Sequence, residues 1–258
     1  MTFPRVLKHG KIEPITENIY WVRGSVKLKA PHPKFGPLTL QFSRNMTIIK
    51  QGDELILVNS VRLDEETLEQ LDSLGKVKHV VRLAAFHGMD DPFYKNRYDV
   101  TIWSVNAPYF SGVDPNPPEA HYFAPDKLLS SKSLPPIPDL KYFEIGSGSL
   151  NEGLFYLERE NGIAISGDSL QNWHQADENF NLTARFMMKK MGFIRPTGIG
   201  PGWVNAVKPD VSELFDFFDW GFETLIPSHG EPITSAASEA FRSSVEKIID
   251  SKKIESRP

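Results

Sequence analysis

Side chains of the kinds that bind metals follow three apolar runs of this sequence. They are His87, Asp90 and Asp91 after the first run, Asp168 after the second and His229 after the third. Imidazole and carboxylate groups together suit Zn²⁺, Fe²⁺ or Mn²⁺. Because the chain has no cysteine, a thiolate metal site, a disulfide and a cysteine nucleophile are all excluded. The pattern indicates a site for one divalent metal ion, assembled from separate strand ends.

Short runs rich in β-branched and aromatic residues predict the strands that position these side chains. The runs lie at 18–24, 45–50, 54–59, 76–86, 99–103, 140–145, 154–168 and 222–230. Gly52-Asp53 and Asn161-Gly162 predict hairpin turns between consecutive strands. Apolar residues spaced three and four apart predict helices at 64–75, 180–191, 211–221 and 235–253.

The helix at 64–75 is the best defined of these elements. Asp64 is suited to cap its first turn, and Gly75 to take a left-handed conformation after its last. This helix connects the strands at 54–59 and 76–86 into a βαβ crossover, whose strands pair in parallel. His87 and the two aspartates therefore follow the carboxyl end of a parallel strand, where open α/β sheets bind ligands.

Length, charge and the distribution of apolar residues limit the number of domains and the kinds of partner. The 258 residues, 40% of them hydrophobic, are enough for one large domain, and we expect a single domain over 1–258. A formal net charge of -4, with basic residues scattered along the chain, argues against nucleic acid as a partner. No run approaches the ~18 apolar residues of a membrane span or a signal-peptide pattern. We expect a cytoplasmic protein that acts on a small-molecule substrate or ligand, away from membranes.

The stretch HGMDDP, residues 87–92, resembles the HxHxDH motif of the metallo-β-lactamase fold. His87 matches the first histidine of the motif and Asp91 matches its aspartate. Met89 and Pro92 stand where the second and third histidines belong, so the motif is degenerate. The resemblance implies a four-layer αββα sandwich, in which two mixed β-sheets are flanked by helices.

Two later stretches extend the resemblance over nearly the whole chain. SGDSL resembles the segment that carries the family's metal-bridging aspartate, here Asp168, and IPSHGEP the segment that carries its last histidine, here His229. The stretch EIGSGSLNEG has no histidine where the family has one, and Asn59 replaces an aspartate in LVNSV. Four of seven ligand positions keep their ligand type, so the resemblance implies at most one ion, held by His87, Asp91, Asp168 and His229.

Such a site implies a mononuclear, metal-dependent hydrolase of small ester or amide substrates. Asp91 or Asp168 would orient the attacking water, and the ion would be zinc or, alternatively, iron or manganese. A different class of function remains open: a catalytically inactive, metal-free member of the fold that binds a ligand or a protein. In that case Asp91, which precedes Pro92, serves as a helix N-cap. A redox role on this scaffold is a third and weaker alternative.

Several assignments depend on tertiary structure. Either Asp90 or Asp91 faces the site, and either His174 or His121 is available to replace a lost ligand. The substrate and the oligomeric state do not follow from the sequence, because one fold hosts many reactions.

Overall fold

The computed structural model describes residues 3, 5–30, 36–109 and 124–255. The larger sheet has seven strands in sequence order: β1 (Glu13–Thr16), β2 (Ile19–Ala30), β3 (Leu38–Gln51), β4 (Glu54–Val58), β5 (Lys76–Arg82), β6 (Thr101–Ser104) and β7 (Lys127–Leu128). The strands pair antiparallel from β1 to β4 and in parallel from β4 to β7, so the sheet is mixed. The predicted βαβ crossover is confirmed.

The second sheet has the order β13-β10-β9-β8. Its strands are β8 (Leu140–Ile145), β9 (Glu152–Leu157), β10 (Ile163–Ile165) and β13 (Thr224–Ile226). A separate short pair consists of β11 (Leu170–Gln171) and β12 (Gly198–Ile199). The strands β10 and β13 are parallel neighbours, so their carboxyl ends lie at the same edge of the sheet.

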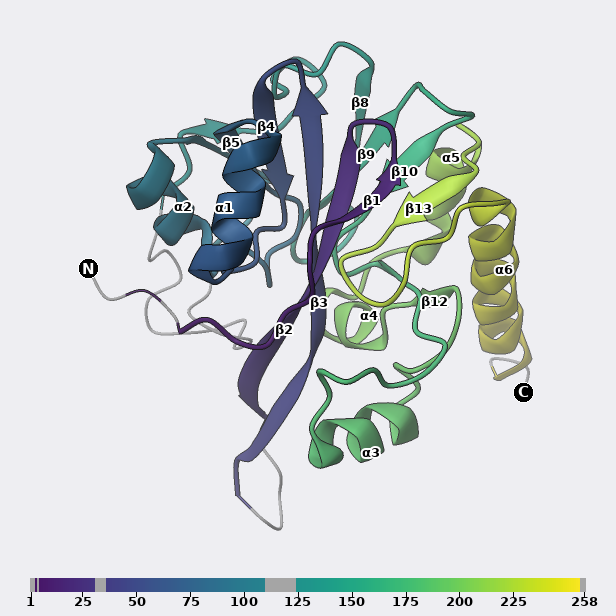
Figure 1. Ribbon diagram of the computed structural model, residues 1–258. Helices are drawn as coiled ribbons and strands as arrows, with labels where there is room; N and C mark the ends of the chain where they lie inside the picture. The colour runs from purple at the N-terminus through teal and green to yellow at the C-terminus, as the bar shows by residue number, and fades with distance from the viewer. Residues whose placement is uncertain (1–2, 4, 31–35, 110–123, 256–258) are drawn as a thin grey trace.

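Helices cover the outer faces of both sheets (Figure 1). They are α1 (Glu65–Leu74), α2 (Asp91–Tyr98), α3 (Leu182–Lys190), α4 (Pro201–Val207), α5 (Leu214–Phe218) and α6 (Ala237–Glu255), with a 3-10 turn η1 (Val211–Glu213) before α5. None of the helices in the described part of the chain combines the length and apolarity that a membrane crossing requires.

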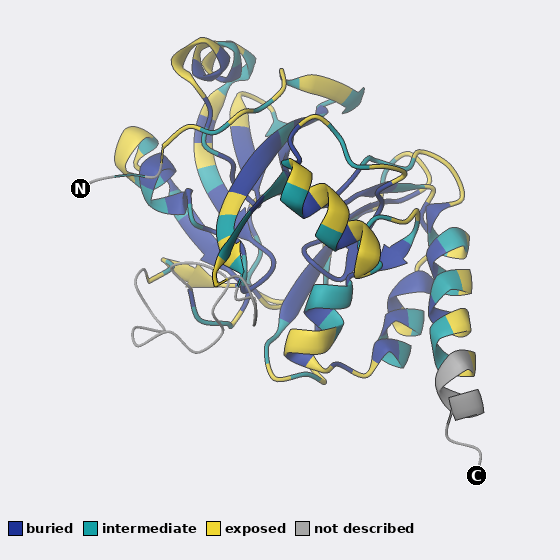
Figure 2. Ribbon diagram, turned by 90° about the horizontal axis from the view of Figure 1, so that it is seen from below, coloured by how far each residue is buried: buried dark blue, intermediate teal, exposed yellow. Residues whose placement is uncertain are grey.

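Three apolar layers hold the sandwich together. Side chains such as Val81 and Phe155 pack between the two sheets, Leu71 packs under α1, and Phe241 packs under α6. In the view from below, most of the strand residues between the two sheets are buried, whereas α6 alternates between buried and exposed residues along its length (Figure 2). This periodic burial is what the three-to-four spacing of apolar residues predicts. The αββα architecture expected from the sequence is confirmed.

Two local predictions need correction. Gly75 is extended (φ 161°) rather than left-handed, and a Cβ atom there would lie 2.7 Å from the carbonyl oxygen of Asp53. Close packing against the preceding turn therefore explains this glycine. The predicted hairpin between β9 and β10 is confirmed, but its turn lies one residue earlier than Asn161-Gly162. The N–H of Gly162 donates to the carbonyl of Arg159, so Glu160 and Asn161, both with positive φ, are the central residues.

The strand ends that carry the candidate ligands are linked across the two sheets. The N–H of Asn45 in β3 donates to the carbonyl of Ser228, and the N–H of Gly153 in β9 donates to the carbonyl of Leu83 after β5. The long β2–β3 hairpin extends past the body of the sandwich beside α3 (Figure 1). The loops after β5, β10 and β13 therefore meet at one edge, next to this hairpin.

Candidate metal centre

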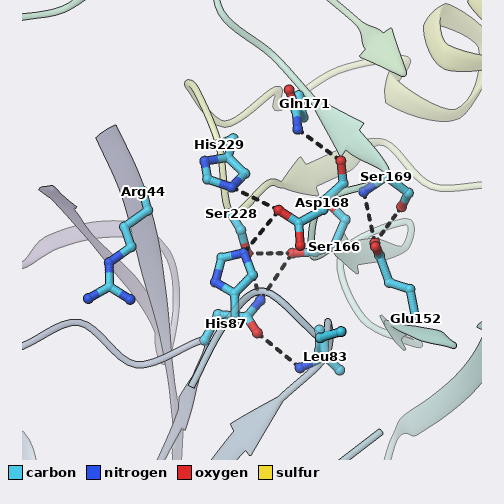
Figure 3. A network of polar contacts seen from close by, with 12 residues as sticks. Arg44, Leu83, His87, Glu152, Ser166, Asp168, Ser169, Gln171, Ser228 and His229 are labelled. Carbon is cyan, nitrogen blue, oxygen red and sulfur yellow. Dashed lines mark hydrogen bonds and ion pairs between the residues drawn. The ribbon is translucent and has the colours of Figure 1, made fainter. Parts of the chain in front are cut away.

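His87, Asp168 and His229 converge at the edge where the two sheets meet (Figure 3). Each offers a ligand atom, and these atoms all lie within 4.8 Å of one another. The Oδ1 atom of Asp168 is 3.1 Å from Nε2 of His229 and 3.4 Å from Nε2 of His87. The centroids of the two imidazole rings are 5.3 Å apart. The two histidines are close enough to share one ion.

The turn that presents His87 depends on Gly88. Its φ is +93°, a conformation that side chains rarely adopt, and a Cβ atom there would lie 2.4 Å from the ring of Tyr109. The glycine allows the chain to reverse directly after His87. The imidazole is thereby directed back toward the strand ends that hold Asp168 and His229.

Several polar atoms of this group are buried without a hydrogen-bond partner. His87, Asp168 and His229 are only 3%, 8% and 6% exposed. Within the described ranges, neither ring nitrogen of His87 nor Oδ2 of Asp168 makes a hydrogen bond. An unsatisfied buried polar group costs about 1–3 kcal/mol, so unsatisfied atoms on two neighbouring residues point to a ligand that satisfies them.

The orientation of His229 adds a second argument. Its Nδ1 atom lies 3.1 Å from the carbonyl oxygen of Ser43, which can only accept, so Nδ1 carries a hydrogen and donates it. A neutral imidazole then directs the lone pair of Nε2 at Oδ1 of Asp168, which is also an acceptor. Only a cation or a proton between these two atoms makes the contact favourable. The arrangement matches metal-binding histidines, which usually donate their other ring N–H to a carbonyl or a carboxylate.

The electrostatics of the group suit a cation. Burial lowers the pKa of His87, so its imidazole is neutral at neutral pH, the form that binds metals. Burial alone would raise the pKa of the Asp168 carboxyl, but the adjacent imidazoles of His87 and His229 together hold that pKa well below its usual range. Two imidazoles and one carboxylate form the kind of three-ligand set that catalytic zinc sites use, with a further position left for water. The residues present therefore fit one divalent ion.

The structure does not bring Asp91 into this group. Its Oδ1 accepts a hydrogen bond from Ser60 (2.6 Å) and its Oδ2 accepts one from Tyr109 (2.8 Å). Burial raises the pKa of Asp91, and these two hydrogen bonds oppose the rise. Asp91 is the first residue of α2, so it does not act as the N-cap either.

Asp90 also faces away from the three ligands. Its carboxylate is buried against the guanidinium of Arg44 and accepts a hydrogen bond from the N–H of Arg62 (2.7 Å). Arg44 itself points away from the ligand group (Figure 3). Asp90 precedes α2, but its side chain makes no capping hydrogen bond.

The two histidines considered as replacement ligands do not join the group. His174 is exposed, and no metal-type group of the described residues includes it. His121 lies outside the described residues. Met89 and Pro92 offer neither a nitrogen nor a carboxylate ligand at the positions where the family has histidines.

Glu152 is a residue that sequence reasoning missed. It begins β9, inside the stretch where the family histidine is absent, and its Oε1 accepts hydrogen bonds from the N–H (2.9 Å) and the hydroxyl (2.6 Å) of Ser169. Burial and the negative charge of Asp168 raise the pKa of Glu152 above its ordinary value. In the sequence, the only sign of this role was an acidic residue at the start of an apolar strand.

Asn59, which replaces the family aspartate, connects the strand ends around the centre. Its side-chain amide donates to the hydroxyl of Ser228 (2.6 Å) and to the carbonyl of Ser166 (3.3 Å). Its side-chain oxygen accepts from the N–H of Leu83 (2.9 Å). The amide can donate and accept at once, which a carboxylate cannot do. Asn59 thus positions the loops that present all three ligands.

Substitution Asn59→Asp is expected to destabilise the fold by about 1–3 kcal/mol, since a buried carboxylate would face the Ser166 carbonyl without a proton to donate. Aspartate tolerates the positive φ of this position (54°) as asparagine does, so backbone strain stays constant. Urea unfolding at neutral pH measures the loss. Asn18→Asp, at φ 62° in a turn, is the matched control and should change stability by less than about 0.5 kcal/mol. Equal losses in both variants would contradict the role given to Asn59.

No family model and no curated protein matches this sequence. Solved structures do match it. The structure of the DIM-1 metallo-β-lactamase exposed to ceftazidime is 14% identical, with a TM-score of 0.56 over 95% of this chain and 100% of that chain. The metallo-β-lactamase FIM-1 from Pseudomonas aeruginosa, in its mono-zinc form, is 16% identical, with a TM-score of 0.54 over 95% and 98% of the two chains.

A third match, VMB-1 at pH 5.5, is 12% identical, with a TM-score of 0.54 over 93% of this chain and 97% of that chain. At such low identities, the shared property is the arrangement of the strands and helices. The agreement covers almost the full length of each chain, and the strand order and the layers agree with the resemblance in the motifs. The chain therefore has the metallo-β-lactamase fold.

Proposed function

We propose that this protein is a metal-dependent hydrolase with a single divalent ion held by His87, Asp168 and His229. The observation that carries the proposal is the convergence of two imidazoles and one carboxylate, with unpartnered buried atoms on His87 and Asp168. The mono-zinc form of FIM-1 supports a one-ion site on this fold. Zinc is the ion best suited to two nitrogens and one oxygen, with iron or manganese as alternatives.

A divalent ion supplies Lewis acidity and makes water a better nucleophile at neutral pH. Side chains of the protein orient the ligands and accept the proton. The hydrogen bond from Nδ1 of His229 to the carbonyl of Ser43 fixes the orientation of the His229 ring. The Oδ2 atom of Asp168 has no partner among the described residues, so it can accept a proton from the attacking water. Asp91 holds the turn between His87 and α2 through Ser60 and Tyr109 instead of binding the ion.

A small ester- or amide-type molecule is the proposed substrate. The three ligands are at most 8% exposed, so a macromolecular substrate would have little access to them. Trp173 and Phe42 pack around His229, with ring centroids 5.4 Å and 6.0 Å from its imidazole. These rings give the centre an apolar wall, which suits the uncharged part of a small substrate. A metal-free binding module is less well supported, because it would leave the buried polar atoms unsatisfied.

The metal content of purified protein tests the proposal. After zinc supplementation and removal of excess metal, elemental analysis is expected to find about one equivalent of zinc in the wild-type protein. His229→Ala should lose the ion, because only two ligands remain. His174→Ala, which removes an exposed histidine outside the group, should retain it.

Hydrolysis of a panel of lactam, thioester, lactone and phosphodiester substrates should follow the zinc content. Less than a tenth of an equivalent of zinc, iron or manganese in the wild-type protein after supplementation would overturn the proposal. Equal zinc content in the His229→Ala and His174→Ala proteins would overturn it as well, since the ion would then be bound elsewhere.

A further inference from the structure

A cationic cavity of about 310 Å³ lies on the far side of the turn that carries His87. The side chains of Arg5, Lys27, Arg44 and Arg62 line it, together with Met89 and the carboxylate of Asp90. None of the three candidate metal ligands borders the cavity. We propose that this cavity is a binding site for a small ligand with a phosphate-type dianionic group.

The positive charge of the cavity is not balanced by its one acidic residue. The carboxylate of Asp90 already pairs with the buried guanidinium of Arg44. Arg5, Lys27 and Arg62 form no ion pair with another described residue. The whole chain has a formal net charge of -4, so this excess of cations is local. Three unpaired cations around one cavity favour an anion with more than one negative charge.

Arg62 is held in place before any ligand arrives. Its guanidinium carbon lies 3.5 Å from the ring centroid of Phe93 and 5.8 Å from that of Phe3. Its Nε and Nη1 atoms are buried and have no hydrogen-bond partner in the described part of the chain. A guanidinium stacked on aromatic rings loses little side-chain entropy when it binds an oxyanion, and its planar fork matches phosphate oxygens.

The remaining lining defines the rest of the ligand. Leu7, Val61 and Met89 give the cavity an apolar part, and its volume is at the lower end of the range for small-molecule sites. A phosphate monoester with a small apolar substituent therefore fits better than free phosphate alone. Met89 and Asp90 belong to the turn that presents His87, so the ligand would contact the metal centre's own loop from outside. This site is independent of the proposed hydrolytic reaction.

Calorimetric titration of the full-length protein with inorganic phosphate and with pyrophosphate tests the inference. Measurements on both chelator-treated and zinc-supplemented protein separate this cavity from anion binding to a metal. We expect both anions to bind in the presence and absence of zinc. The double variant Arg5→Gln/Lys27→Gln should weaken binding by at least ~10-fold, because two charge-assisted contacts are removed.

The matched control is Lys29→Gln, which removes an exposed lysine of the same strand, β2, that does not line the cavity. It should bind as the wild type does, and both variants should keep the wild-type melting temperature because the replaced side chains are exposed. No binding of either anion at ~10 mM, a concentration above the Kd of even weak specific sites, overturns the inference. So does binding that requires zinc or is unchanged in the double variant. These outcomes would overturn only the anion site, because the proposed function is tested separately by the zinc content.

Discussion

Replacing Asp168 with asparagine is expected to abolish zinc binding at micromolar concentrations and hydrolysis with it. Asp168 supplies the only negative charge in the ligand group, and both histidines face its Oδ1. Losing a hydrogen-bond partner of a metal ligand typically costs ~10- to 100-fold in metal affinity, and losing a charged ligand costs more. Competition for zinc with a chromophoric chelator measures the change. Asparagine has nearly the same shape, so the effect reports charge and donor type rather than packing.

Asp91→Asn is the control that separates the sequence motif from the geometry. This aspartate matches the metal-binding position of the motif, yet Ser60 and Tyr109 occupy both of its oxygens. The Asp91→Asn protein should keep about one equivalent of zinc, because all three grouped ligands remain. Circular dichroism and melting temperature show whether each variant is folded. Loss of zinc in Asp91→Asn, together with its retention in a folded Asp168→Asn, would refute the ligand assignment.

The second large effect is expected from Asp90→Asn, which should destabilise the protein by about 3–5 kcal/mol. The guanidinium of Arg44 and the carboxylate of Asp90 are both almost fully buried and pair with each other. Removing the carboxylate charge leaves the arginine buried without a counter-ion, although it keeps hydrogen bonds to the carbonyls of Ser25 and Ser60. Urea unfolding measures the loss.

Asp219→Asn provides the comparison for this prediction. Asp219 pairs with Arg242 on the surface, where the two side chains are 68% and 34% exposed. Water and salt screen such a pair, so its loss should cost less than about 1 kcal/mol. If Asp90→Asn costs no more than Asp219→Asn, the buried pair does not stabilise the turn between β5 and α2.

The sequence alone was sufficient to predict the framework. Short apolar runs predict the strands. The crossover from β4 through α1 to β5 follows from the helical spacing of apolar residues and from the Asp64 cap, whose side chain accepts a hydrogen bond from the N–H of Thr67. These signals are local, because they depend on residues a few positions apart. The same holds for three candidate ligands, since His87, Asp168 and His229 each lie at the end of a predicted strand or directly after it.

Tertiary structure alone decided which acidic residues face the centre. Asp90 and Asp91 are adjacent in the sequence, and no local pattern separates them. Asp91 is held by Ser60 and Tyr109, 31 and 18 residues away, and Asp90 by Arg44, 46 residues away. Each aspartate turns toward the partner that satisfies its buried charge, and that partner is known only once distant strands have paired.

The same reason explains the features that sequence reasoning did not find. Glu152 has a raised pKa because folding buries it and places it beside Asp168. The cationic cavity exists because the N-terminal segment, β2, β3 and the loop after β4 bring their basic residues together. In the sequence these residues look like ordinary surface charges. The sequence determined which segments form strands and helices and which ligand types lie at the strand ends, because those signals depend on local spacing. The tertiary structure decided burial, charge pairing and convergence, because electrostatic energies depend on distances between residues that are far apart in the chain.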